Sequence, residues 1–165
     1  MRRVLITGMS GTGKSSVIEE LTSRGYKAID TDWDPLWERV NGGLYREIAE
    51  SDWVWREDAI QSLLDTEDAD VLFVSACVPN QGRFYNRFDH IVLLTASVDV
   101  TIARLTDRTN NPYGKTPQQA AEVMRNKEAI EPLLKRNATV VIDTSIPLEQ
   151  VVSKILELRG LVKGR

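Results

Sequence analysis

The sequence predicts an α/β fold in which helices cover both faces of a parallel β-sheet. Short apolar runs rich in β-branched residues alternate with segments of helical period, which is typical of βαβ units. These runs are apolar almost throughout, and this indicates strands that are buried on both faces. A glycine-rich loop joins the first apolar run to the first helical segment. Together these observations predict a three-layer α/β/α sandwich.

The expected elements follow one another along the chain in order. The apolar runs that predict strands are residues 4–6, 27–29, 71–74, 90–94 and 139–142. Residues 15–24 place their apolar side chains on one side, and Gly25 follows where a helix C-terminal glycine belongs. Residues 148–156 repeat apolar side chains at the helical period, with Pro147 before them as a helix-entry residue.

Two stretches do not follow the alternation of strands and helices. Residues 32–58 are polar and contain all four tryptophans, and residues 108–118 are rich in turn-forming Asn, Pro and Gly. Long irregular insertions in a compact α/β domain are usually lids or binding loops. We therefore expect these two stretches to move.

Length, charge and hydropathy narrow the class of protein. At 165 residues the chain is long enough for one domain with a sizeable core and too short for two, so we expect a single domain over residues 1–165. Its formal charge of −3 disfavours a protein that coats nucleic acid. It has no run of about eighteen apolar residues, and glycine-rich sequence follows the N-terminus too early for a signal peptide. We expect a cytoplasmic monomer or dimer without a membrane or nucleic-acid partner.

The loop after the first strand matches the Walker A pattern, G-x-x-x-x-G-K-[ST]. Glycines allow the tight turn in which consecutive N–H groups point at phosphate oxygens, and the helix that follows adds its positive dipole end. In this pattern Lys14 reaches the β- and γ-phosphates and the Ser15 hydroxyl ligates Mg²⁺. The expected nucleotide-binding residues are Gly8, Ser10, Gly11, Thr12, Gly13, Lys14, Ser15 and Ser16. The loop predicts binding of ATP with Mg²⁺.

Further motifs resemble the small P-loop kinases, a family that includes shikimate kinase and adenylate kinase. The sequence Asp30-Thr31-Asp32 looks like the Asp-x-Asp of shikimate kinase, and Arg104 with Arg108 is similar to the paired lid arginines of adenylate kinase. The resemblance covers nearly the whole chain. It implies a P-loop NTPase fold with five parallel strands in the order 2-3-1-4-5, an acceptor-binding flap at about residues 32–58 and a lid at about residues 108–118.

The aspartates after the second strand are expected to serve the metal and the acceptor. One carboxylate can organise Mg²⁺-bound water, while another orients or deprotonates an alcohol that attacks the γ-phosphorus. We assign Asp30 to the metal and Asp32 to the acceptor hydroxyl, and Asp34 can substitute for either. The alternative is a solvated acidic turn in which Asp32 or Asp34 caps a helix before Pro35.

The lid arginines have roles that the resemblance implies. Arg104 is expected to stack on the base, and Arg108 to neutralise charge on the phosphoryl group in transfer. Lys115 and Arg125 are further candidates for the lid. Any of these side chains could instead be a solvated helix charge.

The loop after the last strand is similar to the adenine-facing loop of adenylate kinase. Ser145, Ile146 and Pro147 are therefore expected to lie against the base. The alternative is that Thr144 or Ser145 caps the last helix.

Residues 75–83 depart from both named kinases. Shikimate kinase would carry a glycine triplet there, and adenylate kinase an Asp-Gly-Phe-Pro-Arg run. Neither substrate is supported, and Asp30, or Ser75 through water, must hold the metal because the third strand lacks its aspartate. The expected acceptor-binding residues are Asp32, Asp34, Arg56, Asn80, Gln81 and Arg83. The tryptophans Trp33, Trp37, Trp53 and Trp55 could wall a flat or apolar acceptor, or could be the bulk that a small helical flap needs to bury.

The sequence thus predicts an ATP- and Mg²⁺-dependent phosphotransferase that acts on a small-molecule acceptor, an alcohol in the preferred interpretation. Its expected catalytic residues are Lys14, Asp32 and Arg108. A nucleoside or nucleoside monophosphate kinase is the enzymatic alternative. From other classes, a nucleotide-binding switch or ATPase without an acceptor and a polynucleotide 5′-hydroxyl kinase also remain open.

Overall fold

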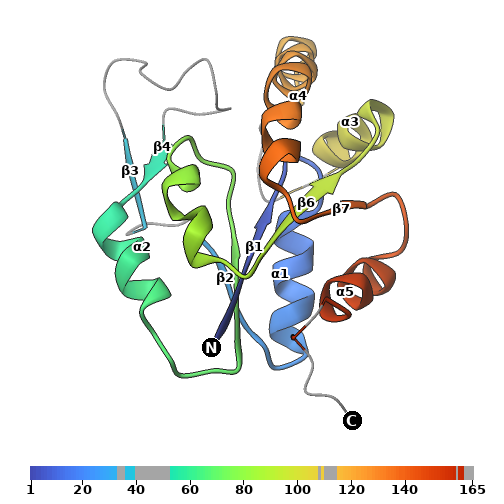
Figure 1. Ribbon diagram of the computed structural model, residues 1–165. Helices are drawn as coiled ribbons and strands as arrows, with labels where there is room; N and C mark the ends of the chain where they lie inside the picture. The colour runs from blue at the N-terminus through green and yellow to red at the C-terminus, as the bar shows by residue number, and fades with distance from the viewer. Residues whose placement is uncertain (33–35, 40–52, 108, 110–114, 159, 162–165) are drawn as a thin grey trace.

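Five parallel strands form the central sheet (Figure 1). The computed structural model describes residues 1–32, 36–39, 53–107, 109, 115–158 and 160–161. The strands are β1 (Arg2–Thr7), β2 (Lys27–Asp30), β5 (Val71–Ser75), β6 (His90–Thr95) and β7 (Val140–Asp143). Their spatial order is β2-β5-β1-β6-β7, and every neighbouring pair is parallel. Counted along the chain among these five strands, this is the predicted order 2-3-1-4-5.

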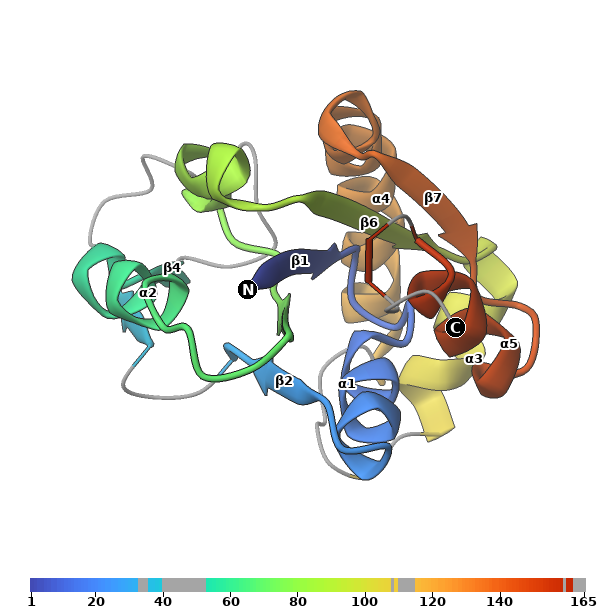
Figure 2. The same cartoon turned by 60° about the horizontal axis from the view of Figure 1, so that its bottom comes forward.

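Helices cover both faces of the sheet (Figure 2). On one face α1 (Lys14–Ser23) packs beside α5 (Leu148–Leu156). The other face carries α2 (Glu57–Leu64), the short 3₁₀ helix η1 (Gln81–Arg87) and α4 (Pro117–Asn137). Side chains of β1 alternate between the layers, so that Val4 and Ile6 join one core cluster and Leu5 joins the other. The predicted three-layer sandwich is confirmed.

The ends of the helices show why the chain turns where it does. Gly25 has φ +87 after α1, and its N–H donates to the Thr22 carbonyl, while the Tyr26 N–H donates to the Leu21 carbonyl. This is the predicted glycine end of the helix. In the part of the chain that the structure describes, no helix is both long enough and apolar enough to cross a membrane.

The segment expected to be an irregular lid includes the beginning of α4. Thr116 is the N-cap of this helix and its side chain accepts a hydrogen bond from the Gln119 N–H, with Pro117 in the first turn. The expectation that the turn-forming stretch runs to residue 118 is therefore wrong at its end, since Pro117 and Gln118 are helical. A proline is tolerated there because the first N–H groups of a helix have no partner within it.

The segment expected to form the flap contains a small antiparallel hairpin. Its strands are β3 (Trp37–Arg39) and β4 (Trp53–Trp55), with Trp37 opposite Trp55. The expectation of a helical flap is wrong for these residues, because alternating bulky side chains suit a strand. Trp55 is 0% exposed and packs edge-on against Phe84, so the packing interpretation holds for this tryptophan. Trp53 is 39% exposed, and Trp33 lies outside the described residues.

Candidate functional site

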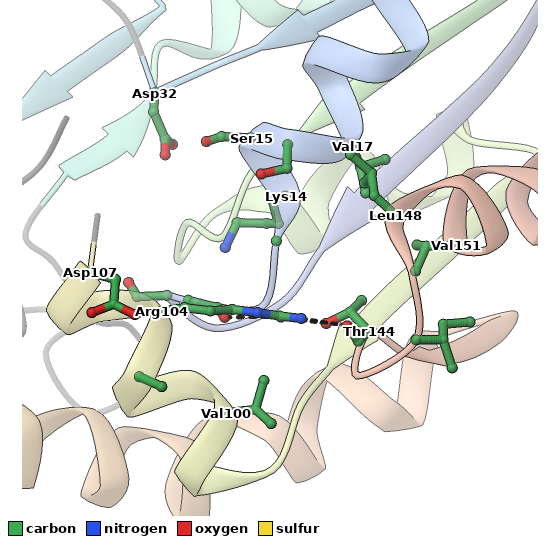
Figure 3. A pocket seen from close by; sticks show the side chains of 16 residues that line it. Lys14, Ser15, Val17, Asp32, Val100, Arg104, Asp107, Thr144, Leu148 and Val151 are labelled. Atoms are coloured by element: carbon green, nitrogen blue, oxygen red, sulfur yellow. Dashed lines mark hydrogen bonds between the residues drawn. The ribbon is translucent and has the colours of Figure 1, made fainter. Parts of the chain in front are cut away.

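A pocket of about 680 Å³ opens where the strands of the sheet reach their carboxyl ends (Figure 3). Its floor is the loop between β1 and α1, and its walls come from α3 (Val98–Asp107), the loop after β7 and α5. Asp32, which follows β2, lines the same pocket. Ligands in open α/β sheets bind at this edge, so the pocket lies where the fold class places a site.

The loop from Gly8 to Ser15 has the backbone shape of a phosphate cradle. Gly11 has φ +80 and Gly13 has φ +99, a region that side-chain-bearing residues rarely enter. Gly13 is also the N-cap of α1, so the first N–H groups of that helix open toward the loop. The Lys14 ammonium donates to the carbonyl oxygens of Gly8 at 2.5 Å and Met9 at 3.1 Å. The lysine is thereby held over the loop at the floor of the pocket.

Polar oxygens gather beside the phosphate loop at the end of β2. The Ser15 hydroxyl donates to Asp30 Oδ2 at 3.2 Å, and the Asp32 N–H donates to Asp30 Oδ1 at 3.0 Å. Hydroxyl and carboxylate oxygens are the ligands that Mg²⁺ takes, together with waters and phosphates, so Ser15 and Asp30 fit this ion. Ser75 is 1% exposed, whereas Asp30 is half-buried and contacts Ser15, which favours Asp30 over Ser75 for the metal.

The alternative of a solvated acidic turn with a helix cap stays open for Asp32, because residues 33–35 lie outside the described residues. Asp32 is exposed and lies in a bend, and the next element with described residues is the strand β3. Asp34 and Arg108 lie outside the described residues, so the roles expected of them stay predictions.

At the opposite end of the pocket, Arg104 is clamped between two loops. Its guanidinium donates to the Thr144 hydroxyl at 2.8 Å, to the Thr144 carbonyl, and to the Gly11 carbonyl at 3.4 Å. The Thr144 hydroxyl in turn donates to the Thr12 carbonyl at 2.7 Å. The guanidinium plane is thus fixed against the phosphate loop. Figure 3 shows the dashed contacts between Arg104 and Thr144 across the pocket.

Apolar side chains line the same pocket as this guanidinium. The apolar residues that line the pocket are Val17, Val100, Ala103, Ile146, Leu148 and Val151. A fixed cationic plane beside an apolar slot suits a flat aromatic base, by stacking and by burial of apolar area. Of the three residues expected at the base, Ile146 lines the pocket and Ser145 and Pro147 do not.

Sequence reasoning missed the role of Thr144. The sequence offers Thr144 only as a cap of the last helix, but the N-cap of α5 is Pro147, without a side-chain cap bond. The Ser145 N–H donates to Asp143 Oδ1 at 2.9 Å. This bond, the Ser145 side chain and the nearby charge of Arg104 hold the pKa of the exposed Asp143 carboxyl below its usual value. Asp107, which also lines the pocket at the end of α3, was missed as well.

Two amides expected to contact the acceptor have partners inside the protein. The Asn80 side chain accepts from the Trp55 N–H at 3.0 Å and donates to the Trp55 carbonyl at 2.9 Å. The Gln81 side chain donates to the Thr7 hydroxyl and accepts from the Val78 N–H, both at 3.0 Å. Neither amide lines the pocket. Both side chains instead hold neighbouring segments of the protein together through these hydrogen bonds. Their contact with an acceptor stays a prediction.

The expected surface cations also lie away from the pocket lining. Arg83 pairs with Glu57 at 2.7 Å, and Arg56 contacts Asp58 at 3.2 Å. Exposed pairs of this kind contribute little to stability. The lid candidates Lys115 and Arg125 are exposed and are not among the pocket residues either.

Comparison with known proteins identifies the class to which this fold and pocket belong. A family model described as an AAA domain matches residues 4–131. A shikimate kinase of Syntrophus aciditrophicus (strain SB) is 30% identical over 175 residues, which cover 94% of this chain and 89% of that protein. A dephospho-CoA kinase of Corynebacterium glutamicum is 24% identical over 168 residues, which cover 99% of this chain and 76% of that protein.

Solved structures agree in fold. The crystal structure of shikimate kinase from Bacteroides thetaiotaomicron superimposes with a TM-score of 0.66 at 21% identity, covering 95% of this chain and 97% of that chain. The fold and the phosphate loop define a P-loop protein. The chain belongs to the P-loop family described as an AAA domain and to the small P-loop kinases that the sequence resembles.

Proposed function

We propose that this chain is a kinase that transfers the γ-phosphoryl group of ATP, with Mg²⁺, to an alcohol group of a small molecule. The observation that carries the proposal is that Lys14 and Asp32 line one pocket. A phosphate-binding cation and an exposed carboxylate thus face the same space. The first would contact the nucleotide and the second the acceptor.

The nucleotide would bind with its base against Arg104 and its phosphates in the loop. The apolar slot around the Arg104 guanidinium takes the base, and the N–H groups that open from Gly13 and Lys14 take phosphate oxygens. Ser15 and Asp30 would hold Mg²⁺, which neutralises charge on the β- and γ-phosphates when it is bound. Lys14 exchanges its loop carbonyls for the phosphates, because an ammonium bonds more strongly to an anion than to a neutral oxygen.

Asp32 would act on the acceptor. As the acceptor oxygen bonds to the γ-phosphorus, the bond from that phosphorus to the β–γ bridging oxygen breaks, and the hydroxyl proton passes to the Asp32 carboxylate. The carboxylate also supports an alcohol over a phosphate acceptor, since it would repel an anion. Arg108 remains the candidate that neutralises the phosphoryl group in transfer.

An acceptor screen tests this proposal. Purified protein with ATP and Mg²⁺ is incubated with separate pools of sugars, shikimate-like alcohols, aminoglycosides, nucleosides and nucleoside monophosphates, and ADP release is compared with the rate without acceptor. We expect an alcohol pool to raise ADP release at least about tenfold, which is below the roughly 10²- to 10⁴-fold that a general base contributes. Lys14→Ala should abolish that stimulation.

The same screen separates the alternatives. Stimulation by nucleoside monophosphates alone would replace the proposal with a monophosphate kinase. ADP release that no pool raises would favour a switch or ATPase without an acceptor.

A further inference from the structure

Trp55 of β4 is held by three hydrogen bonds, two through its backbone and one through its indole. Its N–H donates to the Asn80 side-chain oxygen at 3.0 Å, and its carbonyl accepts from the same amide at 2.9 Å. Its indole Nε1–H donates to the Thr31 hydroxyl oxygen at 2.8 Å. Trp55 and Thr31 are both 0% exposed and Asn80 is 6% exposed. The indole therefore makes a hydrogen bond that water cannot replace.

The Thr31 hydroxyl is both a hydrogen-bond donor and a hydrogen-bond acceptor. The hydroxyl donates to the Ser75 carbonyl at 2.7 Å and accepts from Trp55, and the Thr31 N–H donates to the same carbonyl at 3.1 Å. A hydroxyl has one proton, and that proton is committed to Ser75. Its oxygen is consequently oriented to receive the indole N–H.

Thr31 lies between the two carboxylates of the proposed site. Asp30 is the last residue of β2 and Asp32 lies in the bend that follows, while the Thr31 side chain between them contacts the hairpin through Trp55. Asp30 bonds Ser15, and Asp32 lines the pocket. Whatever fixes Thr31 also fixes the backbone that carries both aspartates.

We propose that Trp55 is a positioning residue whose indole N–H, through Thr31, holds Asp30 and Asp32 in place for Mg²⁺ and acceptor. The hairpin and the carboxylate pair thereby act as one unit, in which the Asn80 amide fixes Trp55 from the side of η1. The inference rests on the proposed function, because the metal role of Asp30 belongs to it. Loss of the indole N–H removes one of the three hydrogen bonds described for Thr31, and Asp30 then presents its oxygens less well to the ion.

The test measures Mg²⁺ dependence and needs no acceptor. Binding of the non-hydrolysable ATP analogue AMP-PNP is titrated against Mg²⁺ for wild type, Thr31→Val, Thr31→Ser and Trp55→Phe, and affinity is measured again in EDTA. Thr31→Val keeps the shape and removes the hydroxyl, while Thr31→Ser keeps the hydroxyl and removes the methyl. Loss of a partner of a metal ligand typically costs about 10- to 100-fold in metal affinity.

We expect Thr31→Val and Trp55→Phe to raise the half-saturating Mg²⁺ concentration at least about tenfold, with Thr31→Ser within about twofold of wild type. Affinity in EDTA should stay unchanged in all three variants, because the phosphate loop is not altered. Phe84→Leu is the matched control, since it removes the ring that packs on Trp55 and keeps the indole bond. Its Mg²⁺ dependence should stay that of wild type.

Each result decides the inference. If Thr31→Ser is impaired and Thr31→Val is not, packing rather than the hydrogen bond matters and the inference is overturned. Asp30→Asn separates the two proposals. If Asp30→Asn raises the half-saturating Mg²⁺ concentration and Thr31→Val does not, this inference alone is overturned. If Asp30→Asn leaves that concentration unchanged, the inference and the metal role of Asp30 are both overturned. Thermal unfolding checks each variant, and either Thr31→Val or Trp55→Phe carries the test if the other does not fold.

Discussion

Gly11 illustrates how single residues shape the phosphate loop. Its φ of +80 strains any side chain, and a Cβ there would lie 3.0 Å from Thr101 Cγ2 and 3.1 Å from Leu105 Cγ, both on α3. The loop thus depends on close approach to a helix more than eighty residues further along the chain. Gly25, at the end of α1, has a similar φ of +87 with no atom within 4 Å of such a Cβ.

This pair of glycines separates strain from crowding. Gly25→Ala should lower the free energy of unfolding by about 1 kcal/mol and leave nucleotide affinity unchanged. Gly11→Ala carries the same strain and adds overpacking of about 1–3 kcal/mol. Because the loop that carries Gly11 must also shift, AMP-PNP affinity should fall at least about tenfold. Urea unfolding measures the change in the free energy of unfolding, and ligand titration measures the change in affinity. Equal nucleotide affinity in the two variants would contradict this account of the loop.

The residues of the phosphate loop could be predicted because the pattern that identifies them is contiguous in the sequence. The Walker A spacing fixes a backbone turn, a lysine and a serine within eight consecutive positions, from Gly8 to Ser15. Thr144 could not be predicted as a site residue, since its contact with Arg104 spans forty positions and depends on where α3 lies. A threonine at a strand end can make many different hydrogen bonds, and the sequence alone does not indicate that this one contacts Arg104.

At the scale of elements, the sheet was predictable and the hairpin was not. The strands of the sheet are buried on both faces and appear in the sequence as continuous apolar runs. The hairpin strands β3 and β4 have three residues each, which is too short for a period to show. Their placement depends on Asn80 and Thr31, which belong to other parts of the chain.

The contact between Arg104 on α3 and Thr144 in the loop after β7 leads to a further prediction. Thr144→Val keeps the volume but removes the hydroxyl, which is one of the acceptors of the Arg104 guanidinium and the donor to the Thr12 carbonyl. We expect AMP-PNP affinity to fall about tenfold, in line with about 1.4 kcal/mol for lost hydrogen bonds that fix the base-binding plane.

Ser145→Ala is the matched control for this link. Ser145 is exposed and outside the pocket lining, so isothermal titration should give wild-type affinity within about twofold. The link has no role in nucleotide binding if Thr144→Val binds as tightly as Ser145→Ala.

At the scale of the whole molecule, one sheet edge brings together parts of the chain that are far apart in sequence. The phosphate loop follows β1, Asp32 follows β2 and Thr144 follows β7, and all three border one pocket. Parallel strands make this possible because their carboxyl ends meet at the same edge. We propose that the pocket has a nucleotide end at Arg104 and an acceptor end at Asp32, and this division is the central claim.

Asp32→Asn tests that division most directly. With the acceptor found in the screen, we expect transfer to fall by about 10²- to 10⁴-fold, the usual contribution of a general base, while AMP-PNP affinity stays within about threefold of wild type. Asp99→Asn is the matched control and should transfer at the wild-type rate, because Asp99 is exposed in the first turn of α3 and is not among the pocket residues. Unchanged transfer by Asp32→Asn, measured as ADP release at saturating ATP and acceptor, would contradict the account.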